Sequence, residues 1–77
     1  MSETSAQQVC RLLRTRGIEV MPGEVCEWLS FTAERVSERT GQRWGSESIA
    51  RLTLQGNKTC TMLLHLRFGD AAARGEK

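Results

Sequence analysis

Apolar residues recur at helical spacing in the first part of the chain. Val9, Leu12 and Leu13 form a stripe over successive turns, and Gly17 stands where such a helix would end. Two residue pairs are suited to a capping box at its start, Thr4 with Gln7 or Ser5 with Gln8. We therefore predict a helix over residues 4–16.

A second helical region is predicted over residues 23–40. Pro22 fits the first turn of a helix, where its missing N–H costs nothing, and Gly41 is a natural end. As one straight helix, the region presents an apolar stripe about 100° wide. The stripe consists of Val25, Leu29 and Val36, flanked by Cys26 and Ala33. Trp28 and Phe31 then lie on a different face.

The same region can also form as two shorter helices with a break near residues 30–32. In that arrangement Phe31 turns inward, and the Thr32 side chain caps the second helix. The pattern of apolar residues does not decide between one helix and two, so both alternatives stay open.

Apolar and polar residues alternate over the C-terminal part of the chain, as is typical of strands. Two runs, residues 47–55 and 59–68, flank Gly56 and Asn57. The alternating apolar residues are Ala50, Leu52, Leu54, Cys60, Met62, Leu64, Leu66 and Phe68. A three-residue loop that includes Lys58 places them all on one face. We therefore predict a β-hairpin covered by the helices, and an α+β fold.

Length and composition indicate one small domain, over residues 1–68, with a disordered tail over 69–77. So short a chain buries a thin core, and a homodimer would compensate for that. The net charge of +2 is far from that of a strongly basic protein. No apolar run is long enough for a bilayer, so we expect no membrane contact. Three cysteines, an odd number, favour a reducing, cytoplasmic location.

Six positions between residues 25 and 36 carry a family resemblance. An apolar and a small residue are followed by an apolar residue, a small residue at a turn, another apolar residue and later a β-branched one. They are Val25, Cys26, Leu29, Ser30, Phe31 and Val36. In this respect the chain resembles helix-turn-helix proteins, and with the hairpin it is similar to a winged helix over residues 5–68. Ser30 departs from the usual glycine, and Arg39 from an expected apolar residue.

The resemblance implies a small regulator of transcription or recombination that binds duplex DNA. The residues it implies as DNA contacts are Arg16, Thr32, Arg35, Arg39, Gln42, Arg43 and Lys58. Two acidic residues in the same segment, Glu34 and Glu38, would repel phosphates unless nearby cations hold the backbone.

The straight helix favours a different function. Trp28 and Phe31 would then be exposed aromatics, which are typical anchors of protein interfaces. The chain would act as a protein-binding inhibitor or adaptor of the phage type, which occludes a partner or dimerises through the open hairpin edge. A helix, a connector and a long helix are also similar to the start of a histone fold, which the predicted hairpin does not fit.

Catalytic and metal chemistry are poorly supported by the residue pattern. The cysteines and the single histidine, His65, contain no Cys-x-x-Cys pair, and each cysteine lies on an apolar stripe. No nucleophile, base and orienting group stand at recognisable spacing. We therefore expect no metal, no cofactor, no small-molecule substrate and no enzymatic activity.

Overall fold

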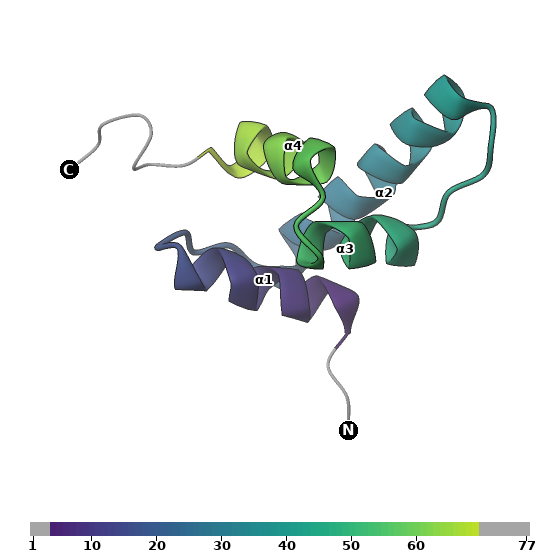
Figure 1. The fold of residues 1–77 in the computed structure, drawn as a ribbon. Helices are drawn as coiled ribbons and strands as arrows, with labels where there is room; N and C mark the ends of the chain where they lie inside the picture. Colours follow the sequence, from purple (N-terminus) through teal and green to yellow (C-terminus); the bar gives the residue numbers. More distant parts are fainter. Residues whose placement is uncertain (1–3, 70–77) are drawn as a thin grey trace.

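The computed structural model describes residues 4–69, and within this range it contains α-helices joined by short connectors. They are α1 (Ser5–Thr15), α2 (Pro22–Thr40), α3 (Ser46–Leu54) and α4 (Lys58–Phe68). The short α3 lies in the middle and packs against each of the other three helices. Figure 1 shows α1 alongside α3, the long α2 behind them, and α4 set on the opposite side of α3 from α1.

The predicted ends of the first two helices are confirmed. Thr4 and Gln7 form the capping box of α1, with the Gln7 backbone N–H 3.1 Å from Thr4 Oγ1. Pro22 is the first residue of α2, and Gly41 ends that helix in a left-handed conformation at φ 76°. These signals act within one turn of chain, which is why they can be identified from sequence.

Of the two alternatives left open for residues 23–40, the straight helix is the one that forms, because α2 is continuous from Pro22 to Thr40 and has no break near residues 30–32. Thr32 does not cap a second helix, since its side chain is buried in the middle of α2. Over the described residues only glycines have a positive φ, so Ser30 does not form the left-handed turn that a break would need.

The predicted β-hairpin, and with it the α+β and winged-helix fold class, is also wrong. Residues 47–55 and 59–68 fall in α3 and α4, and residues 4–69 contain no strand. Residues four apart lie on the same side of both a strand and a helix, so Cys60 and Leu64 fit either structure. Met62 and Leu66, which a strand would bury beside them, are exposed.

A turn was predicted over residues 56–58, and the structure has one over residues 55–57, between two helices instead of two strands. Gly56 adopts φ 86°, and the Asn57 side chain accepts a hydrogen bond from the Cys60 N–H at 3.0 Å. This makes Asn57 the N-cap of α4. A glycine followed by asparagine therefore ends one helix and starts the next, where a hairpin would have used the same two residues as its loop.

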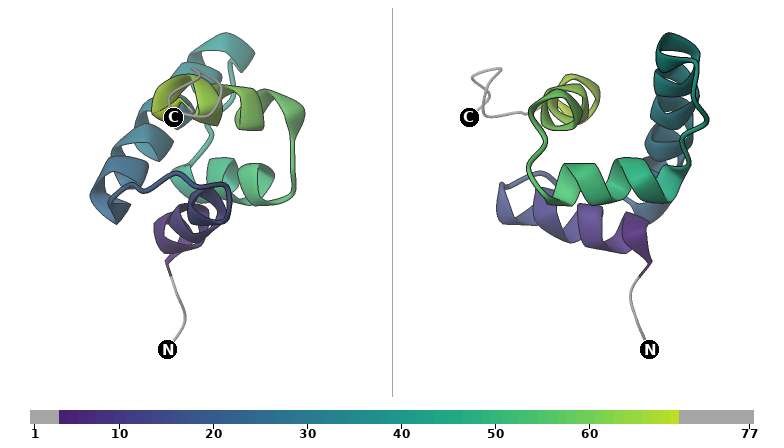
Figure 2. Two further views of the ribbon diagram at one scale, coloured as in Figure 1. Left: turned by 90° about the vertical axis from the view of Figure 1, so that its left-hand side faces the viewer. Right: turned by 45° about the vertical axis from the view of Figure 1, so that its right-hand side comes forward.

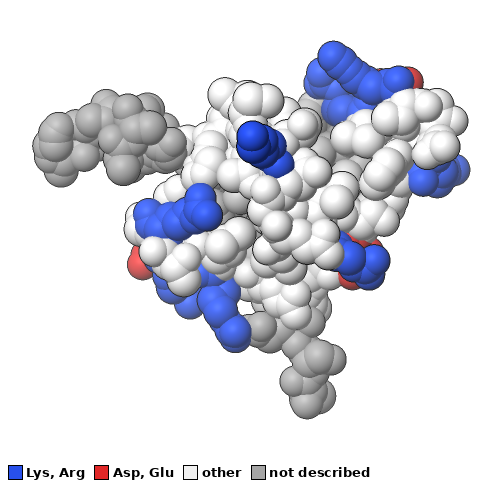
Figure 3. Space-filling view, in the orientation of Figure 1, with Lys and Arg blue, Asp and Glu red and all other residues white. Residues whose placement is uncertain are grey.

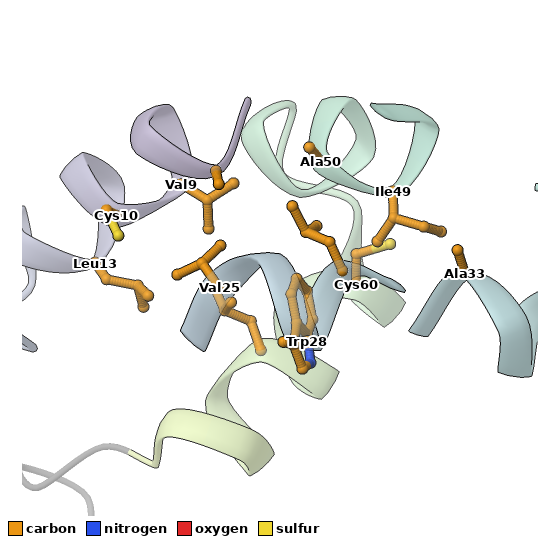
Figure 4. Packing of buried hydrophobic residues seen from close by; sticks show 12 residues of the cluster. Val9, Cys10, Leu13, Val25, Trp28, Ala33, Ile49, Ala50 and Cys60 are labelled. Atoms are coloured by element: carbon orange, nitrogen blue, oxygen red, sulfur yellow. The ribbon is translucent and has the colours of Figure 1, made fainter. Parts of the chain in front are cut away.

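The core lies where α1, α2 and α3 meet, and α4 closes one side of it (Figure 4). Val9 and Leu13 of α1, Val25 of α2 and Ile49 and Ala50 of α3 have no exposed surface. Trp44, in the connector between α2 and α3, is half-buried and packs against the core, and its indole N–H donates to Thr40 Oγ1 at 3.1 Å. The predicted tail lies, apart from Gly69, outside the described residues.

We expect Gly56→Ala to lower the free energy of unfolding by about 1–2 kcal/mol, because a Cβ disfavours the left-handed conformation. No atom lies within 4 Å of the added Cβ, so this cost is conformational. Gly23→Ala is the matched control, and in helical backbone it should stabilise by roughly 0.4–1 kcal/mol. Urea unfolding at constant slope measures both, and equal effects would contradict the left-handed turn.

Trp28→Ala should unfold much of the chain, since truncating a buried aromatic side chain costs about 3–5 kcal/mol. Phe31→Ala, one turn further along α2, should change stability by less than about 0.5 kcal/mol because the side chain is exposed. Thermal unfolding followed by circular dichroism would distinguish them. Similar losses in both variants would place Phe31 in the core as well.

Candidate functional site

The α3–α4 unit (residues 46–68) is a pair of short helices joined by a tight turn. The turn consists of Gln55, Gly56 and Asn57, and Asn57 N–H donates to the Leu52 carbonyl at 2.9 Å. In the right-hand view of Figure 2, α3 lies lengthwise while α4 is seen nearly end-on. The two helices therefore cross at a steep angle, and α4 points out of the plane in which α1 and α3 lie.

Mostly small or β-branched residues, together with one leucine, are buried where α3 and α4 meet. Ala50 and Thr53 of α3 are buried, as are Cys60 and Leu64 of α4. The Thr53 hydroxyl donates to the Ile49 carbonyl at 2.8 Å, so its polarity is satisfied inside the core. Small side chains at such a crossing let two helices approach closely, and the turn then holds α4 in one orientation.

The Cys60 thiol belongs to this contact and is a structural group. Burial raises its pKa, and a hydrogen bond with the Thr53 side chain opposes part of that shift. Burial likewise raises the pKa of the Cys10 thiol in α1, and the nearby charge of Arg14 opposes it. Raised pKa values keep both thiols protonated and unreactive at neutral pH.

The outer face of α4, which we define as Lys58, Thr59, Met62 and Leu66, lies opposite the buried Cys60 and Leu64. Met62 is 56% exposed and Leu66 is 74% exposed. α4 is thus apolar on both sides, although only one side has a partner within residues 4–69. Such a helix is typical of one that meets a further surface.

Charges are unevenly distributed over the described helices. Neither α1 nor α4 contains Asp or Glu, while the described basic residues on or directly after them are Arg11, Arg14, Arg16, Lys58 and Arg67. The described acidic residues lie elsewhere, at Glu19, Glu24, Glu27, Glu34, Glu38 and Glu47. In Figure 3, basic side chains gather over α1 and again over the C-terminal end of α2, and a single one stands amid the uncharged surface between them.

Arg16 connects the end of α1 to α4. Its Nη1 lies 3.2 Å from Nε2 of His65, so the guanidinium donates when Nε2 carries no proton. Nδ1 of the same ring is buried and has no partner within the described residues. The contact places the Arg16 charge beside α4, together with Lys58 at the first position of that helix.

The other residues implied as DNA contacts do not join this group. Arg35 and Arg39 are exposed on the C-terminal half of α2, and Gln42 and Arg43 follow in the connector to α3. This end of α2 extends away from α4 (Figure 1). Thr32 is buried, so its side chain has no surface to offer a ligand.

The aromatic pair implied as a protein-binding face is divided between core and surface. Trp28 is 4% exposed and meets Phe68 of α4 edge-to-face, with 6.3 Å between ring centroids. Phe31 is 58% exposed, and the Arg35 guanidinium lies 5.4 Å from its ring centroid. Because α4 covers Trp28, only Phe31 remains available to a partner.

The sequence did not indicate that Thr59, Met62 and Leu66 share an exposed helix face. The predicted strand would have buried Met62 and Leu66 against the helices. A signal for the helical alternative was present in Gly56 and Asn57, whose order suits the end of one helix and the N-cap of the next. The absence of acidic residues over residues 58–68 was a second signal.

Neither a metal-ligand cluster nor a membrane-spanning helix is present in the part of the chain that the structure describes. There, no three His, Cys, Asp or Glu side chains converge as metal ligands would. None of the described helices combines the length and the apolar character needed to cross a membrane. Comparison with family models, curated proteins and solved structures gave no match.

Thiol reactivity provides a test of this arrangement. We expect Cys26, which is exposed, to react rapidly with a maleimide in the native state, whereas Cys10 and Cys60 react only when the chain opens. Because burial raises the pKa of both buried thiols, folding stability should hold below the ordinary thiol pKa of 9.0 and fall as the pH rises beyond it.

Mass spectrometry of time-quenched labelling gives the rate for each of the three cysteines. Equal labelling rates for all three cysteines in native buffer would show that α3 and α4 do not enclose Cys60.

Proposed function

We propose that the chain is a small non-catalytic regulator that binds duplex DNA through the α3–α4 unit. In this proposal α4 is the recognition helix, and its outer face enters the major groove. The observation that carries the proposal is a pair of steeply crossed helices joined at Gly56, which is in a left-handed conformation. The second helix of this pair has an exposed outer face and contains no acidic residue.

The geometry of the turn supports the proposal. Helix-turn-helix units join two steeply crossed helices through three or four residues that often include glycine. The α3–α4 unit has a three-residue turn with Gly56 at φ 86°. The proposal therefore moves the reading element from α2, which is continuous, to α3 and α4, and it needs no wing.

The spacing of apolar and small residues in the α3–α4 unit also supports the DNA-binding proposal. Ile49, Ala50 and Cys60 reproduce the spacing of Val25, Cys26 and Val36, which carried the original resemblance. All three are buried at the α3–α4 contact or beside it. The other three positions depart from the pattern: they hold Thr53, Leu54 and Gln55 in place of an apolar, a small and an apolar residue. The left-handed residue also comes later, at Gly56.

Charge supports the same face. Phosphates are attracted to cations and repelled by carboxylates. α1 and α4 contain no acidic residue, and Arg16 and Lys58 lie beside the outer face of α4.

The role we infer is regulation of transcription or recombination, as a homodimer in the cytoplasm. The free thiols within the described residues suit a reducing compartment.

The protein-binding role remains a second candidate because of one observation, the exposed Phe31 with Arg35 beside its ring. An inhibitor or adaptor of this kind would use Phe31 without Trp28. It would bind duplex DNA no better than an unrelated protein of equal charge.

Titration of a labelled mixed-sequence duplex, followed by fluorescence anisotropy, tests the DNA proposal. We expect micromolar affinity that falls as salt rises from about 50 to 200 mM. Lys58→Gln and Arg16→Gln should each reduce the slope of log affinity against log salt by about one unit, because each removes a phosphate contact.

Arg39→Gln and Phe31→Ala are the matched controls, since both residues lie on α2 away from α4, and neither should change the slope. Binding that is absent at micromolar protein in low salt, or insensitive to salt, would reject the DNA proposal and favour the adaptor. A reduced slope in Arg39→Gln with no change in Lys58→Gln would place the DNA surface on α2 instead.

A further inference from the structure

The outer face of α4 has a chemical character that its charge does not explain. Met62 and Leu66 lie four residues apart, on the side of α4 opposite Cys60 and Leu64. They are among the most exposed large apolar side chains of the described chain. A helix that served only to hold phosphates would carry polar residues at these positions.

Polar groups on the same face are few and of limited discriminating power. Lys58 is its single cation, and Thr59 carries a hydroxyl that serves either purines or pyrimidines. The face has no Arg, Asn or Gln, the side chains that form paired hydrogen bonds with guanine or adenine. Discrimination between base pairs therefore falls to the two apolar side chains.

An apolar side chain in the major groove has one prominent apolar target among the four bases, the C5 methyl group of thymine. The basic residues around α4 bring the phosphate backbone close, and the thioether of Met62 is flexible enough to fill an irregular gap. Four residues of helix advance about 6 Å, which separates Met62 and Leu66 by roughly two base steps.

We propose that the outer face of α4 reads thymine methyl groups, with Met62 as the principal contact and Leu66 as the second. The ligand is A·T-containing duplex DNA, approached from the major groove. This inference rests on the proposed function and adds to it the class of base that is recognised and the residues that recognise it.

The test uses two alternating duplexes about two helical turns long, one with adenine and thymine and one with adenine and uracil. Uracil keeps the hydrogen-bonding edge of thymine and lacks only the methyl group. We expect wild-type affinity to fall about threefold to fourfold for each contacted methyl group, or about tenfold for two. Adding a C5 methyl to the cytosines of an alternating guanine–cytosine duplex should raise its affinity by a similar factor.

Met62→Ala should reduce the preference for the thymine duplex to about threefold, and the double variant Met62→Ala with Leu66→Ala should bind both duplexes equally. Met62→Leu should keep the full difference because it restores apolar volume. Met62 and Leu66 are exposed, so none of these variants should lose helix content, which circular dichroism checks. Phe31→Ala on α2 is the matched control and should discriminate as the wild type does.

Equal binding of both duplexes by the wild-type chain would overturn this inference and leave the DNA proposal standing. A preference for thymine that persists at its full size in the double variant Met62→Ala with Leu66→Ala would assign it to the shape of the duplex and would likewise overturn the inference. Failure to bind any of the duplexes would reject the DNA proposal itself.

Discussion

Burial of the short helix α3 is the interaction on which the rest of the structure depends. A nine-residue helix is too short to be stable alone in water, so α3 must gain its stability from packing. It does so through Ile49 and Ala50, which have no exposed surface and lie between α1, α2 and α4. α3 therefore contacts all three of the other helices, while α1 and α2 also pack directly against each other.

The position of α4 follows from this arrangement. Because α4 packs mainly on α3, its orientation is set by the three-residue turn, by the Thr53–Cys60 contact and by the covering of Trp28 by Phe68. These constraints act on one side of the helix only. The opposite side, with Met62 and Leu66, is left without a partner in the described chain, and this is what makes α4 the natural candidate for a binding element.

The net charge of +2 conceals a separation of charge that only the fold makes apparent. Acidic residues are concentrated on α2, whereas α1 and α4 have none, and the Arg16–His65 contact brings the ends of these two helices together. An overall charge near neutrality is thus compatible with one face that attracts anions, since fields at a surface depend on the charges within about one Debye length. The net charge of the whole chain therefore does not show the local positive charge near α1 and α4.

The sequence by itself determined the local features. Thr4 and Gln7, Pro22 and Gly41 specify the ends of α1 and α2 through contacts within a single turn, and Gly56 with Asn57 marks the boundary between the last two elements. Tertiary structure alone decided whether those elements are strands or helices, since residues four apart share a face in both. It also decided that Trp28 is buried and Phe31 exposed, because only the packing of α4 distinguishes two aromatic residues on neighbouring parts of one helix.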